Sequence, residues 1–314
     1  MQPRQITQPI VAVEWWGSAT WIVIWVVLGI DLCWLLVAGW TVAWRDVGVV
    51  AAVVAGGYAL LSIGRYRSDL RIRITVTATT QLVMFTAVAG TLSYLVISTC
   101  APLIDAPLAA LDQALGFDWL ALAAWLRVNP TTAAVLRLAY YSGLVQMAVV
   151  VLFLGLTARQ TALDEFVRLF IAATLFTIAI SGALPAAGAW KHYGLSAGYD
   201  LASLAHFEPL RNGQLRHVSL GGMQGLISIP SMHAAAAVLF VHAVRESRPA
   251  LSIFIVLNTA LLVATPVDGS HYLVDVLAGA ALAVGLIVFE RRRRSRPVAS
   301  GQRRPSAVLG ALQR

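Results

Sequence analysis

Two short segments contain the side chains best suited to chemistry: residues 229–233 (Ile-Pro-Ser-Met-His) and residues 269–275 (Gly-Ser-His-Tyr-Leu-Val-Asp). Both lie beside long apolar stretches, where ionisable groups are costly and usually functional. His271 and Asp275 are four residues apart and would share one face of a helix. A carboxylate on one imidazole nitrogen fixes the tautomer and leaves the other nitrogen free to attack.

The first segment adds groups that would hold and protonate a phosphate ester. Pro230 and Ser231 ahead of an apolar run predict the start of a helix, whose free N–H groups and positive dipole end suit a phosphate. Ser231 contributes a hydroxyl donor, and His233 in the first turn could protonate a leaving oxygen. The combination predicts a covalent phosphohistidine intermediate, with no metal ion and no other cofactor.

The composition indicates that membrane helices must position these residues. Hydrophobic residues make up 59% of the 314 residues and charged residues 12%, and the mean hydropathy is +0.75. These values exclude an ordinary soluble domain and predict a polytopic membrane protein. The cysteines, Cys33 and Cys100, are too few for a disulfide framework or a Cys-rich metal site. The first apolar stretch lacks a signal-peptide cleavage pattern, so we expect it to be retained.

We expect an all-α transmembrane bundle, because eight apolar stretches approach the ~20 residues needed to cross the hydrocarbon layer. They lie near Thr20–Gly39, Val47–Ile63, Ile74–Ile97, Thr132–Leu156, Val167–Leu184, Ser231–Val244, Leu251–Pro266 and His271–Phe289. Asp31, in the middle of the first span, matches no motif. Its carboxyl could be protonated, pair with a polar neighbour or face a cavity.

Three segments outside the spans differ in character. Leucine and tryptophan recur at helical spacing over residues 105–130, with aspartates between them, which predicts an amphipathic helix along the membrane interface. Residues 185–229 form a long polar connection of the kind that is usually functional or disordered. Residues 291–314 are rich in Arg, Ser and Pro and are expected to be a disordered cytoplasmic tail.

These boundaries divide the chain into four parts: accessory spans (residues 1–104), the interfacial helix (105–130), a catalytic core (131–290) and the basic tail (291–314). Most Lys and Arg residues fall on one side of the eight-span arrangement, and the positive-inside rule places that side in the cytoplasm. Both termini are then cytoplasmic. The interfacial helix, the long connection and the starts of the sixth and eighth spans face the extracytoplasmic side of the plasma (inner) membrane.

This topology brings the two chemical segments together. The chain crosses the membrane after His233, turns, and crosses back before His271, so both histidines open a span on the same face. The predicted site therefore lies near the outer membrane surface, beside the connection formed by residues 185–229.

The two segments resemble motifs of the type 2 phosphatidic acid phosphatase superfamily. Pro-Ser-Met-His at 230–233 is similar to that family's Pro-Ser-Gly-His, and His271 with Asp275 is similar to the His and Asp of its last motif. The sequences Ile-Pro-Ser-Met-His-Ala-Ala and His-Tyr-Leu-Val-Asp-Val-Leu-Ala-Gly resemble those of the branch that contains inositol phosphorylceramide synthases. The resemblance covers residues 136–289 and implies a six-helix core, with His271 as nucleophile, Asp275 orienting it and His233 as the acid.

The sequence departs from the family at its basic residues. The family's Lys, six residues, Arg-Pro motif is absent, and Ala264 and Thr265 stand where Ser-Arg usually precedes the last motif. A transferring phosphoryl group needs cationic stabilisation. The candidates are Arg211, Arg216 and Lys191, all in the 185–229 connection. Arg211 is favoured because it lies between Pro209 and Gly213. The alternative for these residues is a non-catalytic role, as solvated loop charges or as contacts to lipid headgroups.

The resulting expectation is a membrane enzyme that hydrolyses lipid phosphates or pyrophosphates. Its partners would be the lipid phosphate substrate, membrane lipids, and water or a lipid alcohol as acceptor. An alternative is a phosphotransferase that passes a phosphodiester headgroup to a lipid alcohol. A second alternative is a non-catalytic transporter or scaffold with the same fold. No nucleic-acid partner is expected, because the neighbouring span explains the run Arg291 to Arg294 as a membrane anchor.

Overall fold

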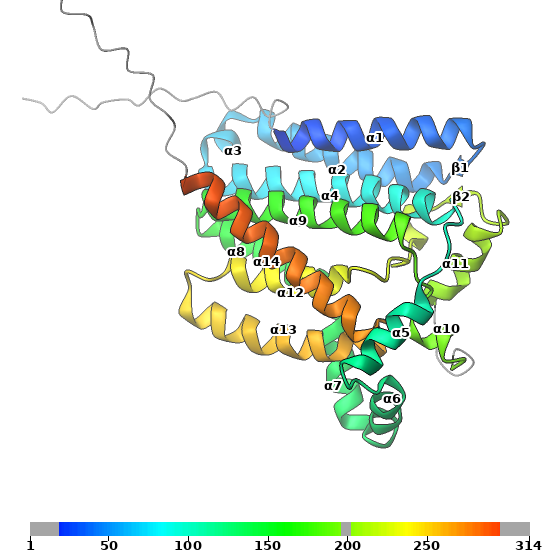
Figure 1. Cartoon of the computed structure of the whole chain (residues 1–314). Helices are drawn as coiled ribbons and strands as arrows, with labels where there is room; N and C mark the ends of the chain where they lie inside the picture. Colours follow the sequence, from blue (N-terminus) through cyan, green and yellow to red (C-terminus); the bar gives the residue numbers. More distant parts are fainter. Residues whose placement is uncertain (1–18, 196–201, 296–314) are drawn as a thin grey trace, which may run out of the picture.

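The computed structural model describes residues 19–195 and 202–295, which are almost entirely helical (Figure 1). Its helices are α1 (Ala19–Val37), α2 (Trp44–Ser62), α3 (Gly64–Ser68), α4 (Leu70–Ile97), α5 (Asp105–Ala114), α6 (Trp119–Val128), α7 (Pro130–Tyr141), α8 (Gly143–Leu156), α9 (Gln160–Ala183), α10 (Ala189–His192), α11 (Ala202–Arg211), α12 (Met232–Ala243), α13 (Arg248–Asp268) and α14 (Leu273–Ser295). Two-residue strands, β1 (Thr41–Val42) and β2 (His217–Val218), pair in parallel, and a 3-10 turn, η2 (Leu220–Gly222), follows β2.

The helices have the lengths and hydropathy of a multi-pass membrane protein. Within the described residues, six are long and apolar enough to span a membrane (α1, α2, α4, α9, α13 and α14), and α7 with α8 forms a seventh stretch bent by 48°. α12 has 12 residues, about 18 Å at 1.5 Å per residue, so it is shorter than the ~30 Å hydrocarbon layer. Each predicted span corresponds to one of these helices or to the bent pair, which confirms the all-α bundle.

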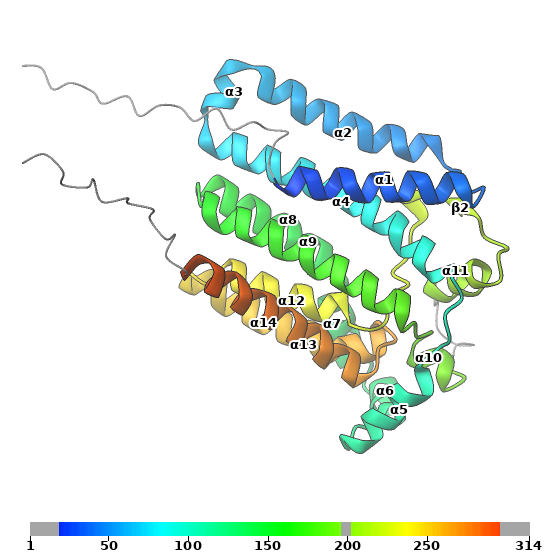
Figure 2. The same cartoon turned by 45° about the horizontal axis from the view of Figure 1, so that its top comes forward.

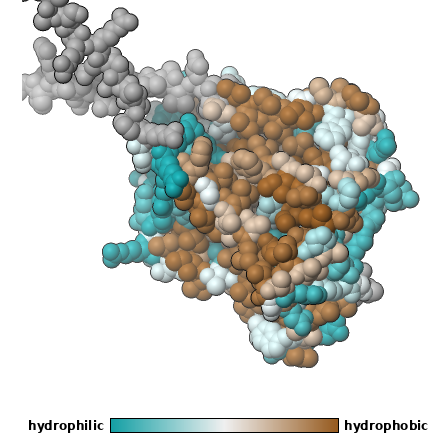
Figure 3. Space-filling view, in the orientation of Figure 1, coloured by the Kyte–Doolittle hydropathy of each residue, from teal (hydrophilic) through white to brown (hydrophobic). Residues whose placement is uncertain are grey.

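The surface agrees with this assignment. An apolar band covers the middle of the face shown in Figure 3, between more polar ends. We call the end where α12 and α14 begin the histidine end. The opposite end is the arginine end, because Arg245, Arg248 and Arg291 lie there, at the other ends of α12, α13 and α14.

Three layers of helices make up the bundle (Figure 2). α1, α2 and α4 form one layer, α8 and α9 lie next to it, and α12, α13 and α14 lie beyond. The largest buried cluster joins the layers through Phe85 of α4, Phe166 of α9 and Phe240 of α12. The helices that carry the two histidines are therefore packed against α9, which separates them from the layer of α1, α2 and α4.

The segments between the spans are more structured than the sequence predicts. The single interfacial helix expected over residues 105–130 is two helices, α5 and α6, because the chain turns over residues 115–118. The 185–229 connection contains α10, α11, β2 and η2, with residues 196–201 outside the described part. α14 continues to Ser295, past the predicted start of the tail at Arg291, and residues 296–314 lie outside the described residues.

A buried carboxylate ties the arginine ends of three helices together. Glu165 of α9 accepts hydrogen bonds from His242 Nε2 (3.1 Å) and Arg245 Nη2 (2.9 Å), on and after α12. Arg294 of α14 approaches the same carboxylate at 3.4 Å. The Glu165 side chain is only 3% exposed. The three donors therefore take the place of the water molecules that would solvate this carboxylate at the surface. The network sets the relative height of α12 and α14 along the bundle.

At the histidine end, α12 and α14 meet with almost no space between their backbones. A Cβ atom added to Gly279 of α14 would lie 2.1 Å from the carbonyl oxygen of Ser231 and 3.2 Å from the Cβ of Ala234. Only glycine allows this approach. The small residue therefore brings the first turn of α12 onto α14.

Replacing Gly279 by alanine should lower the stability of the protein by about 1–3 kcal/mol, because the added methyl group overlaps backbone atoms that must shift. Thermal unfolding of the detergent-purified protein measures the effect. Gly285→Ala is the matched control on the same helix, because a Cβ there meets no atom within 4 Å. It should leave stability unchanged or slightly raised. Equal unfolding temperatures for the two variants would contradict the role assigned to Gly279.

Candidate active site

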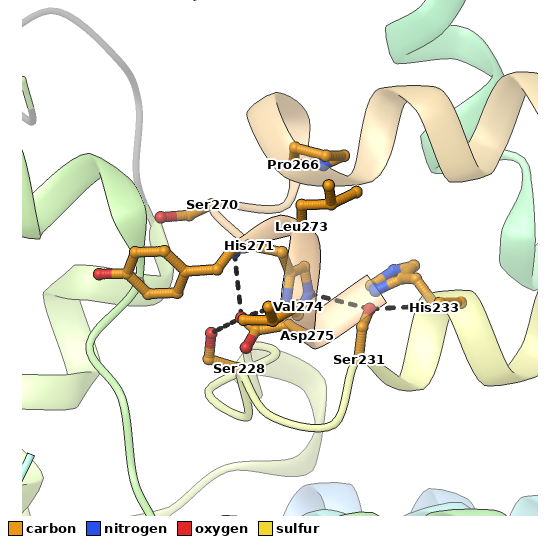
Figure 4. Close-up of polar contacts among 12 residues, drawn as sticks. Ser228, Ser231, His233, Pro266, Ser270, His271, Leu273, Val274 and Asp275 are labelled. Atoms are coloured by element: carbon orange, nitrogen blue, oxygen red, sulfur yellow. Dashed lines mark hydrogen bonds and ion pairs between the residues drawn. The ribbon is translucent and has the colours of Figure 1, made fainter. Parts of the chain in front are cut away.

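His271 and Asp275 lie at the start of α14 and are both buried, with residue exposures of 3% and 0%. His271 Nδ1 is 3.4 Å from Asp275 Oδ2, an ion-pair separation rather than an aligned hydrogen bond. The same oxygen accepts from Ser228 Oγ (2.8 Å) and from the Tyr272 backbone N–H (3.1 Å). These donors hold the carboxylate behind the ring, so Nε2 is the nitrogen that faces away from Asp275 (Figure 4).

Ser231 lies on the Nε2 side and caps α12. Its Oγ is 3.3 Å from His271 Nε2 and accepts from the Ala234 backbone N–H at 3.4 Å. Its own backbone N–H donates to the carbonyl of Asp275 at 3.0 Å. Ser231, the cap of α12, is therefore linked to the start of α14 twice: by its backbone N–H and by its side chain.

His233 completes the group that the sequence singled out. It lies in the first turn of α12, and its ring centroid is 6.4 Å from that of His271, with the planes 67° apart. The structure thus brings Ser231, His233, His271 and Asp275 together from two segments (Figure 4). The space between the two imidazoles lies at the N-terminus of α12, where the first N–H groups of a helix have no intrahelical acceptor.

Tyr140, on α7, is a neighbour of the site that the sequence analysis missed. Its ring stacks on His233 with centroids 4.3 Å apart, and its hydroxyl is 3.4 Å from His233 Nδ1. One turn earlier, Arg137 pairs with Asp268 of α13 at 3.2 Å. The spacing of Arg137 and Tyr140, three residues apart inside a predicted span, could have drawn attention to this helix face. Nothing in the sequence indicated that α7 packs on α12 and α13.

The turn between α13 and α14, which carries His271, is clamped from outside. Trp119 of α6 donates its indole N–H to the carbonyls of Pro266 and His271, each at 3.1 Å. Ser270 has a left-handed backbone (φ 57°), which is uncommon for a residue other than glycine. Its carbonyl and hydroxyl accept from the backbone N–H groups of Ala189 and Trp190. Such strain persists only where neighbouring contacts hold it.

Two aspartates of α5 extend the clamp. Asp112 accepts from the backbone N–H groups of Leu273 (2.8 Å) and Val274 (2.9 Å), which caps α14 from another helix. Asp105 accepts from the Tyr272 hydroxyl (2.9 Å) and from the N–H groups of residues 187 and 188. Burial raises the pKa of Asp112, and the two backbone donors oppose that shift. Two of the aspartates that appeared to interrupt an amphipathic helix, Asp105 and Asp112, are thus buried in the protein, while Asp118 is exposed.

The predicted phosphate-binding cations lie at different places. Arg211 donates to the carbonyl of Ala101 (2.9 Å), and its guanidinium lies 5.6 Å from the Phe207 ring centroid. Lys191 contacts Glu208 and lies 5.7 Å from the same ring. Loss of solvent lowers the pKa of Lys191, and Asp105 opposes the shift. Arg216 instead donates to the carbonyl of Ala38 after α1 (3.1 Å), so the structure does not bring it to the histidines.

A small cavity lies between the Phe207 ring and the back of the site. It is lined by Phe207, Ser228, Gly188, Gly269 and Ser270, among others. Ser228 is the donor to Asp275, and Ser270 precedes His271. Lys191 and Arg211 both lie over the Phe207 ring, which is one wall of this cavity, and neither of them lines the cavity itself. Among residues 19–195 and 202–295, no group of three or more His, Cys, Asp or Glu side chains is arranged to hold a metal ion.

A family model described as the PAP2 superfamily matches residues 106–289. The match begins within α5 and ends within α14, so it includes both histidine segments and the clamping helices α5, α6 and α10. Comparison with curated proteins gave no match to the chain, and neither did comparison with solved structures.

Asp112→Ala should loosen the start of α14, because it removes the acceptor for two backbone N–H groups. Loss of a capping side chain costs about 0.5–2 kcal/mol. Hydrogen exchange at Leu273 and Val274 should become faster. Asp118→Ala is the matched control: Asp118 also caps a helix, accepting from Ala121 N at 2.8 Å, but the helix is α6. Unchanged exchange at residues 273 and 274 in Asp112→Ala would show that Asp112 does not hold this turn.

Proposed function

The chain belongs to the PAP2 superfamily, and on this premise we propose that it is a membrane phosphatase that hydrolyses lipid phosphates or pyrophosphates through a phosphohistidine at His271. The observation that carries the proposal is the orientation of His271. Asp275 lies behind Nδ1, while Nε2 faces Ser231 and the N-terminus of α12. This is the arrangement that an attacking imidazole needs.

The phosphate would bind between the two imidazoles. Ser231 Oγ already caps Ala234, which leaves the N–H groups of Met232 and His233, among the described residues, for an anion. A helix N-terminus attracts phosphate through these N–H groups and through its dipole. The Ser231 hydroxyl lies 3.3 Å from Nε2, so the same group would hold a phosphate oxygen close to the attacking nitrogen.

The reaction would proceed in two balanced steps. In the first, the Nε2 lone pair of His271 forms a bond to phosphorus, the bond from phosphorus to the leaving oxygen breaks, and His233 gives that oxygen a proton. In the second, water transfers a proton to His233 and its oxygen bonds to phosphorus, while the phosphorus–Nε2 bond breaks. Asp275 supports the positive charge that His271 carries in between. Tyr140, stacked on His233, would orient the acid.

The arginine end would face the cytoplasm by the positive-inside rule, and the site would then lie on the extracytoplasmic side of the inner membrane. A lipid would enter from the side, with its chain between helices and its phosphate at α12. Water would reach the site from the polar histidine end.

The sequence of the two motifs also favours a second candidate, a phosphotransferase of the inositol phosphorylceramide synthase kind. The first step would be the same, and a lipid alcohol would replace water in the second. The non-catalytic scaffold remains the third reading, because among the described residues no arginine contacts either histidine. One assay with two acceptors separates the three.

The deciding experiment is phosphate release by detergent-purified protein from a panel of lipid phosphates, pyrophosphates and phosphodiesters, with EDTA present. We expect release that His271→Ala abolishes, since the nucleophile is gone, while the variant keeps its unfolding temperature. A new lipid product, formed only when a lipid alcohol is added, would instead establish the transferase. Absence of turnover with either acceptor, in a folded wild-type protein, would contradict both enzymatic proposals.

We further propose that Lys191 and Arg211 supply the positive potential that the family arginines would otherwise give. Lys191→Met and Arg211→Gln should each lower kcat/KM by about tenfold or more, because each removes a cation near Phe207, which lines the cavity behind the site, and so weakens the positive potential that stabilises the transferring phosphate. Arg216→Gln is the control and should retain full activity, because Arg216 lies beside the end of α1, away from Phe207 and the cavity behind the site. Equal losses in all three variants would point to a general surface-charge effect and against the proposal.

A further inference from the structure

A second cavity lies in the layer of α1, α2 and α4, away from the histidines. Its volume is about 510 Å³, within the ~300–1,000 Å³ range of small-molecule sites, and its walls are mostly apolar side chains of these three helices. Val42 and Leu220 line it at the histidine end. Apart from Leu220, its lining residues precede the residues matched by the family model.

The cavity is elongated along the bundle. Its lining on α2 runs from Trp44 to Tyr58, a distance of about 21 Å at 1.5 Å per residue. On α4 it runs from Met84 to Thr91. α2 is loosely packed, with Leu61 as its one buried residue. A space of this length and apolarity suits a single extended hydrocarbon chain.

Asp31 is the one carboxylic acid among the described residues that line this cavity. The residue is 2% exposed, and both carboxyl oxygens are buried without a hydrogen-bond partner among the described residues. Asp31 also lines the cavity. Buried polar groups in proteins are almost always hydrogen-bonded, so this carboxyl calls for a polar ligand group.

The depth of Asp31 limits what that group is. It lies six residues before Val37, the last residue of α1 at the histidine end, which is about 9 Å along the helix. A phosphate or another large anionic headgroup would have to lose its water at this depth and approach a carboxyl. A hydroxyl or a protonated amine is small and donates a hydrogen bond, which Asp31 lacks.

We propose that this cavity binds a single-chain amphiphile whose small head, a hydroxyl or an amine, donates a hydrogen bond to Asp31. The chain of the ligand would lie along α2 between Trp44 and Tyr58. The site is separate from the His271 centre, since α9 lies between the layer of α1, α2 and α4 and the helices that carry the histidines (Figure 2). The proposal therefore stands independently of the phosphatase activity.

The test is photo-crosslinking of the purified full-length protein with octadecanol that carries a diazirine in its chain, followed by mapping of the labelled peptides. Octadecanol, octadecylamine and octadecyl methyl ether serve as competitors. We expect labels on α1, α2 and α4, with the ether at least about tenfold weaker than the better of the two donors, because it cannot donate to Asp31. Whichever donor competes better identifies the head group.

Variants at the cavity make the test specific. Asp31→Leu should abolish the preference for donors over the ether while the chain still binds. Asp31→Asn keeps an acceptor and should retain binding of the alcohol. Thr91→Val is the matched control in the same cavity and should change nothing, because the Thr91 hydroxyl is bonded to the carbonyl of Ala87. Equal competition by ether and alcohol in the wild type, or labels confined to other helices, would overturn the proposal.

Discussion

The backbone N–H of Ser231 donates to the carbonyl of Asp275, and this hydrogen bond joins the first turns of α12 and α14. The two helices reach this distance because Gly279 has no side chain to separate them. His271 Nε2 then faces Ser231, and His233 lies on the adjacent turn. If the helices moved apart by even the width of a methyl group, the imidazoles, the hydroxyl and the helix N-terminus would no longer share one space. The chemistry proposed for the site thus rests on a backbone contact.

Buried carboxylates repeat as a means of fixing the polypeptide around that contact. Asp275 holds the His271 ring, Asp112 caps α14, and Asp105 holds Tyr272. Each acts by accepting hydrogen bonds from backbone or hydroxyl donors, which offsets the cost of removing a carboxylate from water. Glu165 does the same with cationic donors at the opposite end. Asp31 differs, since neither of its oxygens has a partner among the described residues, and that contrast is the basis for assigning it a ligand.

The two halves of the protein contribute differently. The part matched by the family model contains the histidines, α9 and the clamping residues other than Asp105, which immediately precedes it. The layer of α1, α2 and α4 adds a long apolar cavity, and the strand β1 that follows α1 pairs with β2. With a site for lipid phosphate and a separate site for a single-chain amphiphile, the family-matched part and the layer of α1, α2 and α4 would each bind a lipid.

The amino-acid sequence alone determined that the chain is a bundle of apolar helices and where the histidines lie along them. Apolar stretches define the spans, the return through α13 places His233 and His271 at one end, and four-residue spacing sets Asp275 beside His271, because these are local or periodic properties of the chain. Tyr140, Trp119, Asp105 and Asp112 could not be placed in the same way. Their partners lie between 82 and 167 residues away, and periodicity shows which face of a helix is apolar without showing which helix covers it. The basic residues were ambiguous for the same reason: Arg211 and Arg216 are five residues apart, yet one lies over Phe207 and the other bonds to Ala38, a difference that only the packing of α11 and β2 decided.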